Sequence, residues 1–164
     1  MRNNNNRRAV MWALYGLFYV LVLLVETTVF ADHRYFGAKL SFLPVAVACV
    51  ACFTGHEAGG LFGLCAGFFY TCAGASALCI VTFTLIGVFA GWLCDAVFAR
   101  RLVPAALVCL GALMIHQFAA FLLQRVMAGA DVPFHWPVCE SVFSWPAAVP
   151  AYFLCKVIRK AGGE

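Results

Sequence analysis

The chain has 164 residues, of which 65% are hydrophobic and 11% are charged, and its formal net charge is +4. Soluble domains carry roughly 25% charged residues, and a core of this size cannot hide so much apolar surface from water. The composition therefore excludes a water-soluble globular protein and predicts a single all-α domain with lipid as its solvent. It also excludes a nucleic-acid-binding protein, because the basic residues form no stripe with interleaved aromatic residues.

Six apolar runs, separated by more polar segments, are the main feature of the sequence. A transmembrane helix needs about 20 apolar residues, within a range of about 17–25. Each run is therefore a candidate span, and we expect six transmembrane helices, the second and third of which are short. In chain order the runs are Ala9–Phe30, Leu40–Thr54, Ala58–Cys72, Ala75–Cys94, Leu102–Gln124 and Ser144–Ile158.

The first run predicts a helix that follows a polar leader, residues 1–8, and ends in Glu26-Thr27-Thr28. A carboxylate near the end of a span is costly unless it reaches the lipid headgroups or finds a partner. In the preferred interpretation, Glu26 extends to the outer headgroup level. In the second interpretation, Glu26 faces a groove between helices and accepts hydrogen bonds from another span or from a docked protein.

Only Gly55, His56 and Glu57 separate the second run from the third. Because both runs are short, they form either two tilted spans or one re-entrant hairpin. Both arrangements return the chain to the side that it left. His56-Glu57 begins like a zinc-protease helix, but the second histidine is missing, so the pair indicates no metal site.

Glycine recurs every four residues in the third run. This spacing places the residues on one face of a helix, where small side chains let two backbones approach closely in lipid. Gly87 and Gly91 repeat the spacing in the fourth run, so we expect the third and fourth helices to pack together. A partner membrane protein is the alternative user of this face. The glycines of the third run are Gly59, Gly60, Gly63 and Gly67.

The fifth run carries His116 and Gln117 near its middle. Polar side chains at mid-membrane depth face the bundle interior, a cavity or a partner helix. The pair is therefore either structural, through interhelical hydrogen bonds worth ~0.6 kcal/mol each, or part of a functional site. The longest polar connection, Arg125–Phe143, follows. Trp145 then opens the last run at the depth of the interfacial aromatic belt.

Basic residues favour one side of the predicted bundle, and this bias sets its orientation. We predict a multi-pass protein with both termini in the cytosol: a leader at 1–8, one transmembrane domain at 9–158 and a tail at 159–164. Anionic lipid is the expected partner of the inner basic groups. The outer side holds Arg34, Lys39 and Arg125, and the inner side holds Arg2, Arg7, Arg8, Arg100, Arg101, Lys156, Arg159 and Lys160.

Motifs for catalysis or cofactor binding are absent from the sequence. No glycine loop for phosphate precedes a lysine, and the intramembrane polar residues are too few and scattered for a proton relay or an active site. Most cysteines lie in or at the ends of apolar runs, where cysteine behaves as a small hydrophobe. We therefore expect no enzymatic activity, no cofactor and no metal, and a function in packing and docking.

The order of these features resembles the rod shape-determining protein MreD family from about Glu26 to Gln124. The resemblance implies a non-catalytic scaffold subunit of the bacterial plasma membrane that couples cell shape to peptidoglycan synthesis. An MreC-like scaffold protein and other membrane proteins of the elongation complex are the implied partners. Glu26, the glycine face and the outer loop Arg34–Lys39 are our docking candidates. The resemblance rests on Glu26-Thr27-Thr28-Val29-Phe30, Phe36-Gly37-Ala38-Lys39-Leu40, Gly55–Phe69 and Gly87-Val88-Phe89-Ala90-Gly91.

The alternative is the substrate-binding S component of an energy-coupling-factor vitamin transporter, which the chain also resembles in outline. Such subunits are small six-helix proteins with an outward-facing vitamin pocket and a docking face of small residues on the first helix. Ala9-x-x-x-Ala13 fits that face. A vitamin site needs several convergent polar groups, and few are apparent, so the scaffold interpretation is preferred. The pocket candidates are His116, Gln117, Trp136 and Trp145.

Overall fold

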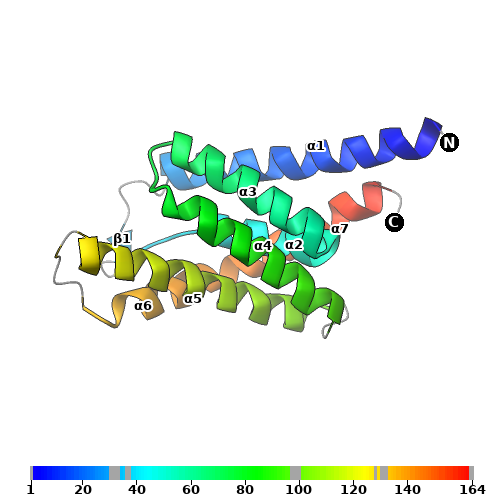
Figure 1. The fold of residues 1–164 in the computed structure, drawn as a ribbon. Coiled ribbons are helices and arrows are strands. Elements are labelled where there is room, and N and C mark those ends of the chain that lie inside the picture. Colours follow the sequence, from blue (N-terminus) through cyan, green and yellow to red (C-terminus); the bar gives the residue numbers. More distant parts are fainter. Residues whose placement is uncertain are drawn as a thin grey trace.

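The computed structural model describes residues 2–29, 34–35, 38–96, 101–127, 129 and 133–162. Over these residues the protein is a helical bundle, which confirms the all-α prediction. Figure 1 shows the start of α1 and the end of α7 at the same end of the bundle. The helices are α1 (Arg2–Leu24), α2 (Leu43–Thr54), α3 (His56–Cys72), α4 (Leu78–Ala96), α5 (Leu102–Met127), α6 (Trp136–Ser144) and α7 (Ala148–Ala161).

Short irregular elements extend or connect the helices. A π-helical turn, η1 (Val25–Val29), continues α1, and a 3-10 turn, η2 (Trp145–Ala147), joins α6 to α7. Pro146 has no backbone N–H to donate, which explains why regular α-helical bonding is interrupted at η2. Between η1 and α2, the two-residue strands β1 (Arg34–Tyr35) and β2 (Ala38–Lys39) pair antiparallel.

Four helical segments are long and apolar enough to cross a membrane: Arg7–Val29, Leu78–Ala96, Leu102–Val126 and Trp136–Ala161. The last combines α6, η2 and α7. The other two helices are shorter, with 12 residues in α2 and 17 in α3. At 1.5 Å per residue they extend over ~18 Å and ~26 Å, less than the ~30 Å of a bilayer core. The short second and third helices agree with the prediction from sequence.

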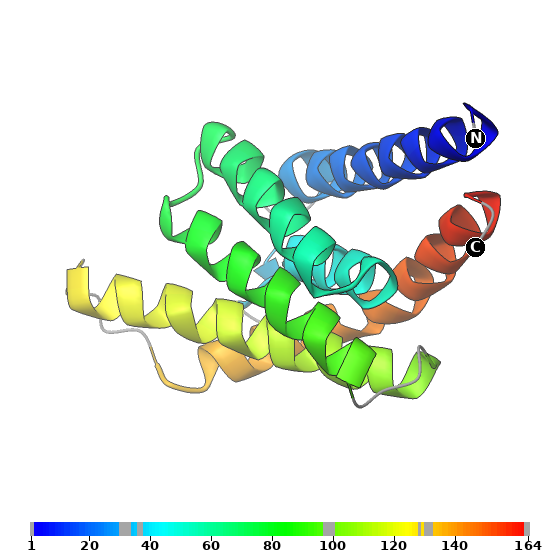
Figure 2. The same ribbon diagram turned by 45° about the vertical axis from the view of Figure 1, so that its right-hand side comes forward.

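The shortest of these, α2, lies at the centre of the bundle. Every residue from Leu43 to Phe53 is buried, and α2 contacts α1, α3, α4, α5 and α7. Figure 2 shows α2, in cyan, partly hidden behind α3 and α4. A helix that is apolar on every side is stable only where it is covered all round. Because its neighbours cover it, α2 need not reach both faces of a membrane.

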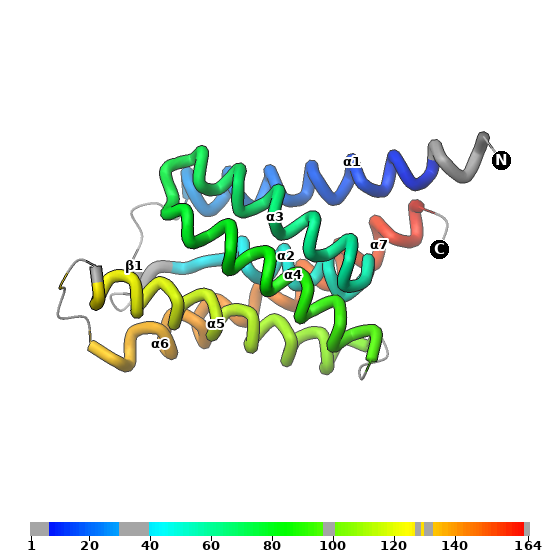
Figure 3. The backbone as a smooth tube through the Cα atoms, viewed as in Figure 1, coloured from blue at the N-terminus to red at the C-terminus, as the bar shows by residue number. Residues whose placement is uncertain are grey.

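The first helix runs along the outside of the bundle. Figure 3 shows α1, in blue, running along one edge of the bundle. It begins at Arg2, so most of the predicted leader belongs to the helix. Tyr15, Phe18 and Tyr19 are buried, whereas Leu17 and Leu21 are more than half exposed. Exposed leucines of this kind suit contact with lipid, which is apolar.

Candidate functional site

The glycine repeat lies in the contact between α3 and α4. A Cβ atom added at Gly59 would lie 2.8 Å from the carbonyl oxygen of Gly87, and one added at Gly67 would lie 2.6 Å from the Cα atom of Ile80. Ordinary van der Waals contact begins at 3.4 Å. Only glycine therefore lets the two backbones approach so closely.

The other glycines of the set lie along the same contact. A Cβ atom added at Gly63 would meet the backbone carbonyl of Phe83, and one added at Gly91 would meet the backbone at the start of α3. At Gly60 the neighbour is a side chain, because an added Cβ atom would lie 2.7 Å from Cγ2 of Val88. The glycine face is thus used within the chain, between α3 and α4.

Glu26 lies inside the protein, in the π-helical turn η1. Its side chain is only 2% exposed, so the preferred interpretation, a carboxylate that extends to the headgroups, is wrong. Its Oε2 accepts hydrogen bonds from the backbone N–H groups of Phe42, at 2.8 Å, and Leu43, at 3.0 Å. The Tyr70 hydroxyl donates to Oε1 at 3.2 Å. Glu26 therefore accepts hydrogen bonds from other helices, as the second interpretation predicted.

These bonds supply a cap that α2 cannot provide for itself. The first N–H groups of a helix have no acceptor within it, and the N-cap residue, Phe42, has no side-chain oxygen. Pro44, in the first turn, removes one of these donors. The helix dipole favours a carboxylate at this end, and charge-assisted hydrogen bonds strengthen the contact. Glu26 thereby fixes the end of α1 to the start of the central helix.

A cavity of about 340 Å³ lies beside this cap. It is lined by residues of η1, α3, α4, α5 and α6. Figure 1 places α6 and the last turns of α5 at the end of the bundle away from the start of α1 and the end of α7. Small-molecule sites have volumes of about 300–1,000 Å³, so the cavity is large enough for a small ligand. Its polar lining includes Glu26, Tyr70, His116, Gln117, Trp136 and Glu140.

All three polar residues singled out in the sequence meet in this cavity. Glu26 comes from η1, whereas His116 and Gln117 come from the middle of α5. The Nδ1 atom of His116 lies 3.3 Å from the Thr82 hydroxyl oxygen. Gln117 is 6% exposed, and the described part of the chain offers its amide no hydrogen bond. The two neighbours thus differ: His116 has a protein partner, and Gln117 does not.

Sequence reasoning missed Tyr70 and Glu140 as lining residues. Tyr70 follows Gly67 by three positions, which places it one helical turn beyond the glycine repeat. Glu140 follows Trp136 by four positions and therefore shares its helix face. That spacing is the available signal, but it becomes informative only once residues 136–144 are known to be helical. Trp145 does not line the cavity; its indole N–H donates to the Ala106 carbonyl at 2.8 Å.

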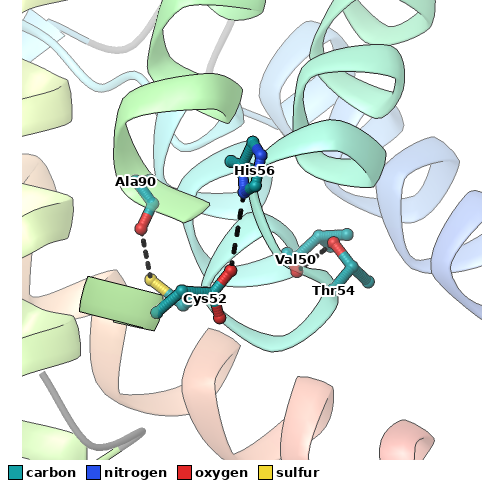
Figure 4. A network of polar contacts seen from close by, with 6 residues as sticks. Val50, Cys52, Thr54, His56 and Ala90 are labelled. Atoms are coloured by element: carbon teal, nitrogen blue, oxygen red, sulfur yellow. Dashed lines mark hydrogen bonds and ion pairs between the residues drawn. The ribbon is translucent and has the colours of Figure 1, made fainter. Parts of the chain in front are cut away.

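The opposite end of α2 carries a second group of polar contacts, shown in Figure 4. His56 Nδ1 lies 3.8 Å from an Asp95 carboxylate oxygen, and both side chains are well exposed. An exposed pair of this kind contributes little to stability. Cys52 Sγ lies 4.0 Å from the Ala90 carbonyl oxygen, so this cysteine packs against α4. Among the described residues, no three His, Cys, Asp or Glu side chains are grouped to hold a metal ion.

The third docking candidate, the loop Arg34–Lys39, is described only in part. Its short strands β1 and β2 are described, but residues 36–37 and the side chains of the whole loop lie outside the described part. Comparison of the chain with protein-family models, with curated proteins and with solved structures finds no match.

Proposed function

We propose that the chain is a multi-pass, non-catalytic scaffold subunit of the bacterial cell-elongation machinery, similar to the MreD family. The observation that supports this proposal best is the α3–α4 contact. Two of the four segments that carry the resemblance, Gly55–Phe69 and Gly87–Gly91, belong to helices whose backbones meet in the fold. Small residues let two helices pack closely in a membrane, and a closely packed pair is a suitable frame for a partner-docking surface.

The proposed topology has six passes and cytosolic termini in the bacterial plasma membrane. In it α2 and α3 cross as a short pair, and the surrounding helices and Glu26 satisfy the buried start of α2. Two observations support this topology. The start of α1 and the end of α7 lie at one end of the bundle, and these two helices carry Arg7 and Arg8 in the first turns of α1 and Arg159 and Lys160 in the last turn of α7.

The list of candidates for the docking surface must be revised. Glu26 is buried against α2, and the glycine face is occupied by α4, so neither is exposed to a partner. The outer loop Arg34–Lys39 is the remaining candidate for contact with an MreC-like protein. Charge reversal at Arg34 and Lys39, with charge reversal at Arg125 as a control outside the loop, tests this assignment by co-purification of the partner.

Depletion of the protein from a rod-shaped bacterium that encodes it tests the function itself. The scaffold role predicts that cells become round and that new peptidoglycan is no longer inserted along the side wall. A wild-type copy and a Gly111→Ala copy should both restore the rod shape, because a Cβ atom at Gly111 meets nothing within 4 Å. Depleted cells that remain rods with normal side-wall growth would contradict the proposal.

The cavity favours a second candidate function, the substrate-binding subunit of a vitamin transporter. The sequence showed few convergent polar groups, whereas the structure gathers Glu26, Tyr70, His116, Gln117 and Glu140 around one cavity. The corresponding test is vitamin uptake by the depleted cells. Lost uptake with normal cell shape would select this function, and normal uptake in rounded cells would remove it.

A further inference from the structure

We infer that the cavity beside Glu26 binds a small, planar, non-anionic molecule with an amide-like edge, meaning a hydrogen-bond donor and acceptor side by side. The inference goes beyond the scaffold role, because it concerns a ligand and not the surface for a protein partner. It starts from the amide of Gln117, which lies in a deeply buried lining residue and has no hydrogen bond to the described part of the chain.

The amide of Gln117 is available to a ligand, because the described residues give it no hydrogen bond. Its side chain carries two N–H donors and one acceptor oxygen, it is only 6% exposed, and it lines the cavity. Its amide atoms are not among the fully enclosed polar atoms, so a molecule in the cavity can reach them. Glutamine recognises a flat edge best when that edge offers a donor beside an acceptor, because both hydrogen bonds then form in one plane, as in its pairing with adenine.

His116 supplies a second polar group on the same wall. Its Nδ1 atom lies 3.3 Å from the Thr82 hydroxyl oxygen, which leaves Nε2 as the ring nitrogen without a hydrogen bond in the described part of the chain. The histidine ring is held in place by Phe83, whose ring centroid lies 5.1 Å away. His116 also lines the cavity, so its ring is a second candidate contact for a ligand that is hydrogen-bonded to Gln117.

The shape and charge of the cavity lining further restrict the class of ligand. Tyr70, Phe121 and Trp136 give the cavity aromatic lining, and aromatic rings favour a planar ligand that can stack on them or meet their edges. Its charged lining residues are Glu26 and Glu140, with no lysine or arginine among the described ones. Carboxylates on the wall disfavour an anion. The cavity volume of about 340 Å³ suits a ligand at the small end of the drug-sized range.

Binding of 4-fluorobenzamide to the full chain in detergent micelles, followed by fluorine NMR, tests the inference. Empty micelles provide the blank. We expect saturable binding to the protein, with 4-fluorobenzoate, the anion, and 4-fluoroacetophenone, which lacks the donor, each bound at least tenfold more weakly. Gln117→Leu should weaken binding of the amide at least tenfold. Ile115→Leu, at an exposed position that does not line this cavity, should leave it unchanged.

Three results would overturn the inference: no saturable binding above the blank, equal binding of the benzoate, or unchanged binding by a folded Gln117→Leu variant. If Gln117→Leu does not fold, Ala120→Leu takes its place, because Ala120 lines the cavity and a larger side chain there fills it. Unchanged binding by Ala120→Leu would also overturn the inference. The rod-shape assay does not depend on ligand binding, so failure of the scaffold proposal is distinguishable from failure of the ligand-binding inference.

Discussion

Replacing Gly67 by alanine tests whether α3 and α4 are held together at backbone distance. The added Cβ atom would lie 2.6 Å from the Cα atom of Ile80 and 2.8 Å from the carbonyl oxygen of Cys79. Ordinary contact begins at 3.4 Å, so the helices must separate locally by about 0.8 Å. Backbone atoms cannot rotate out of the way as a side chain can. The variant therefore forces the two helices apart.

The expected loss of stability follows from two opposing terms. Overpacking costs ~1–3 kcal/mol, and alanine is favoured over glycine inside a helix by ~0.5–1 kcal/mol. Because both clashing atoms belong to the backbone, we expect the upper part of the first range and a net loss of ~1–2 kcal/mol. The loss applies to the free energy of unfolding of the protein in detergent.

Unfolding in detergent, followed by tryptophan fluorescence, measures this change, and Gly111→Ala is the matched control. Gly111 is also inside a long helix, but a Cβ atom there would meet nothing within 4 Å. The control should be unchanged or more stable by up to ~1 kcal/mol. If Gly67→Ala is as stable as Gly111→Ala, the helices are not in backbone contact and the reasoning is refuted.

Two further substitutions test the hydrogen bonds that hold the helices together. Glu26→Ala should destabilise the protein by ~2–5 kcal/mol, because the N–H groups of Phe42 and Leu43 lose their acceptor. Glu26→Gln, which keeps an acceptor oxygen, should cost clearly less in the same unfolding assay; equal losses would mean that capping is not the role of Glu26. Tyr19→Phe removes the hydroxyl that donates to the Ala66 carbonyl at 2.6 Å, and we expect a loss of ~0.5–1.5 kcal/mol. A variant as stable as the wild type would show that this bond does not help to hold α1.

The helices themselves were largely predictable, because long apolar runs and a four-residue glycine repeat are local signals. The α3–α4 contact follows from such a repeat on both helices. The central position of α2 cannot be predicted from a local signal of this kind. A short apolar run has the same composition whether it is a truncated span or a helix enclosed by its neighbours. Only the tertiary contacts show that α2 is the centre of the bundle.

The candidate site was predictable in its residues but not in its geometry. Glu26, His116 and Gln117 are conspicuous in sequence because polar groups inside apolar runs are costly. Their convergence depends on how α1 and α5 are placed around α2, which no local pattern encodes. The cap of Glu26 on Phe42 likewise joins residues 16 positions apart, across a connection whose path cannot be inferred from its composition. The headgroup interpretation failed for that reason.

Reporter fusions at both ends of the chain test whether the protein is embedded in the membrane with both termini in the cytosol. A fluorescent protein that matures only in the cytosol and alkaline phosphatase, which is active only outside it, can be fused in turn to each terminus. A membrane-embedded bundle with cytosolic termini predicts fluorescence and no phosphatase activity at both ends, with the protein extracted from membranes only by detergent. Termini on opposite faces, or a chain that dissolves without detergent, would contradict it.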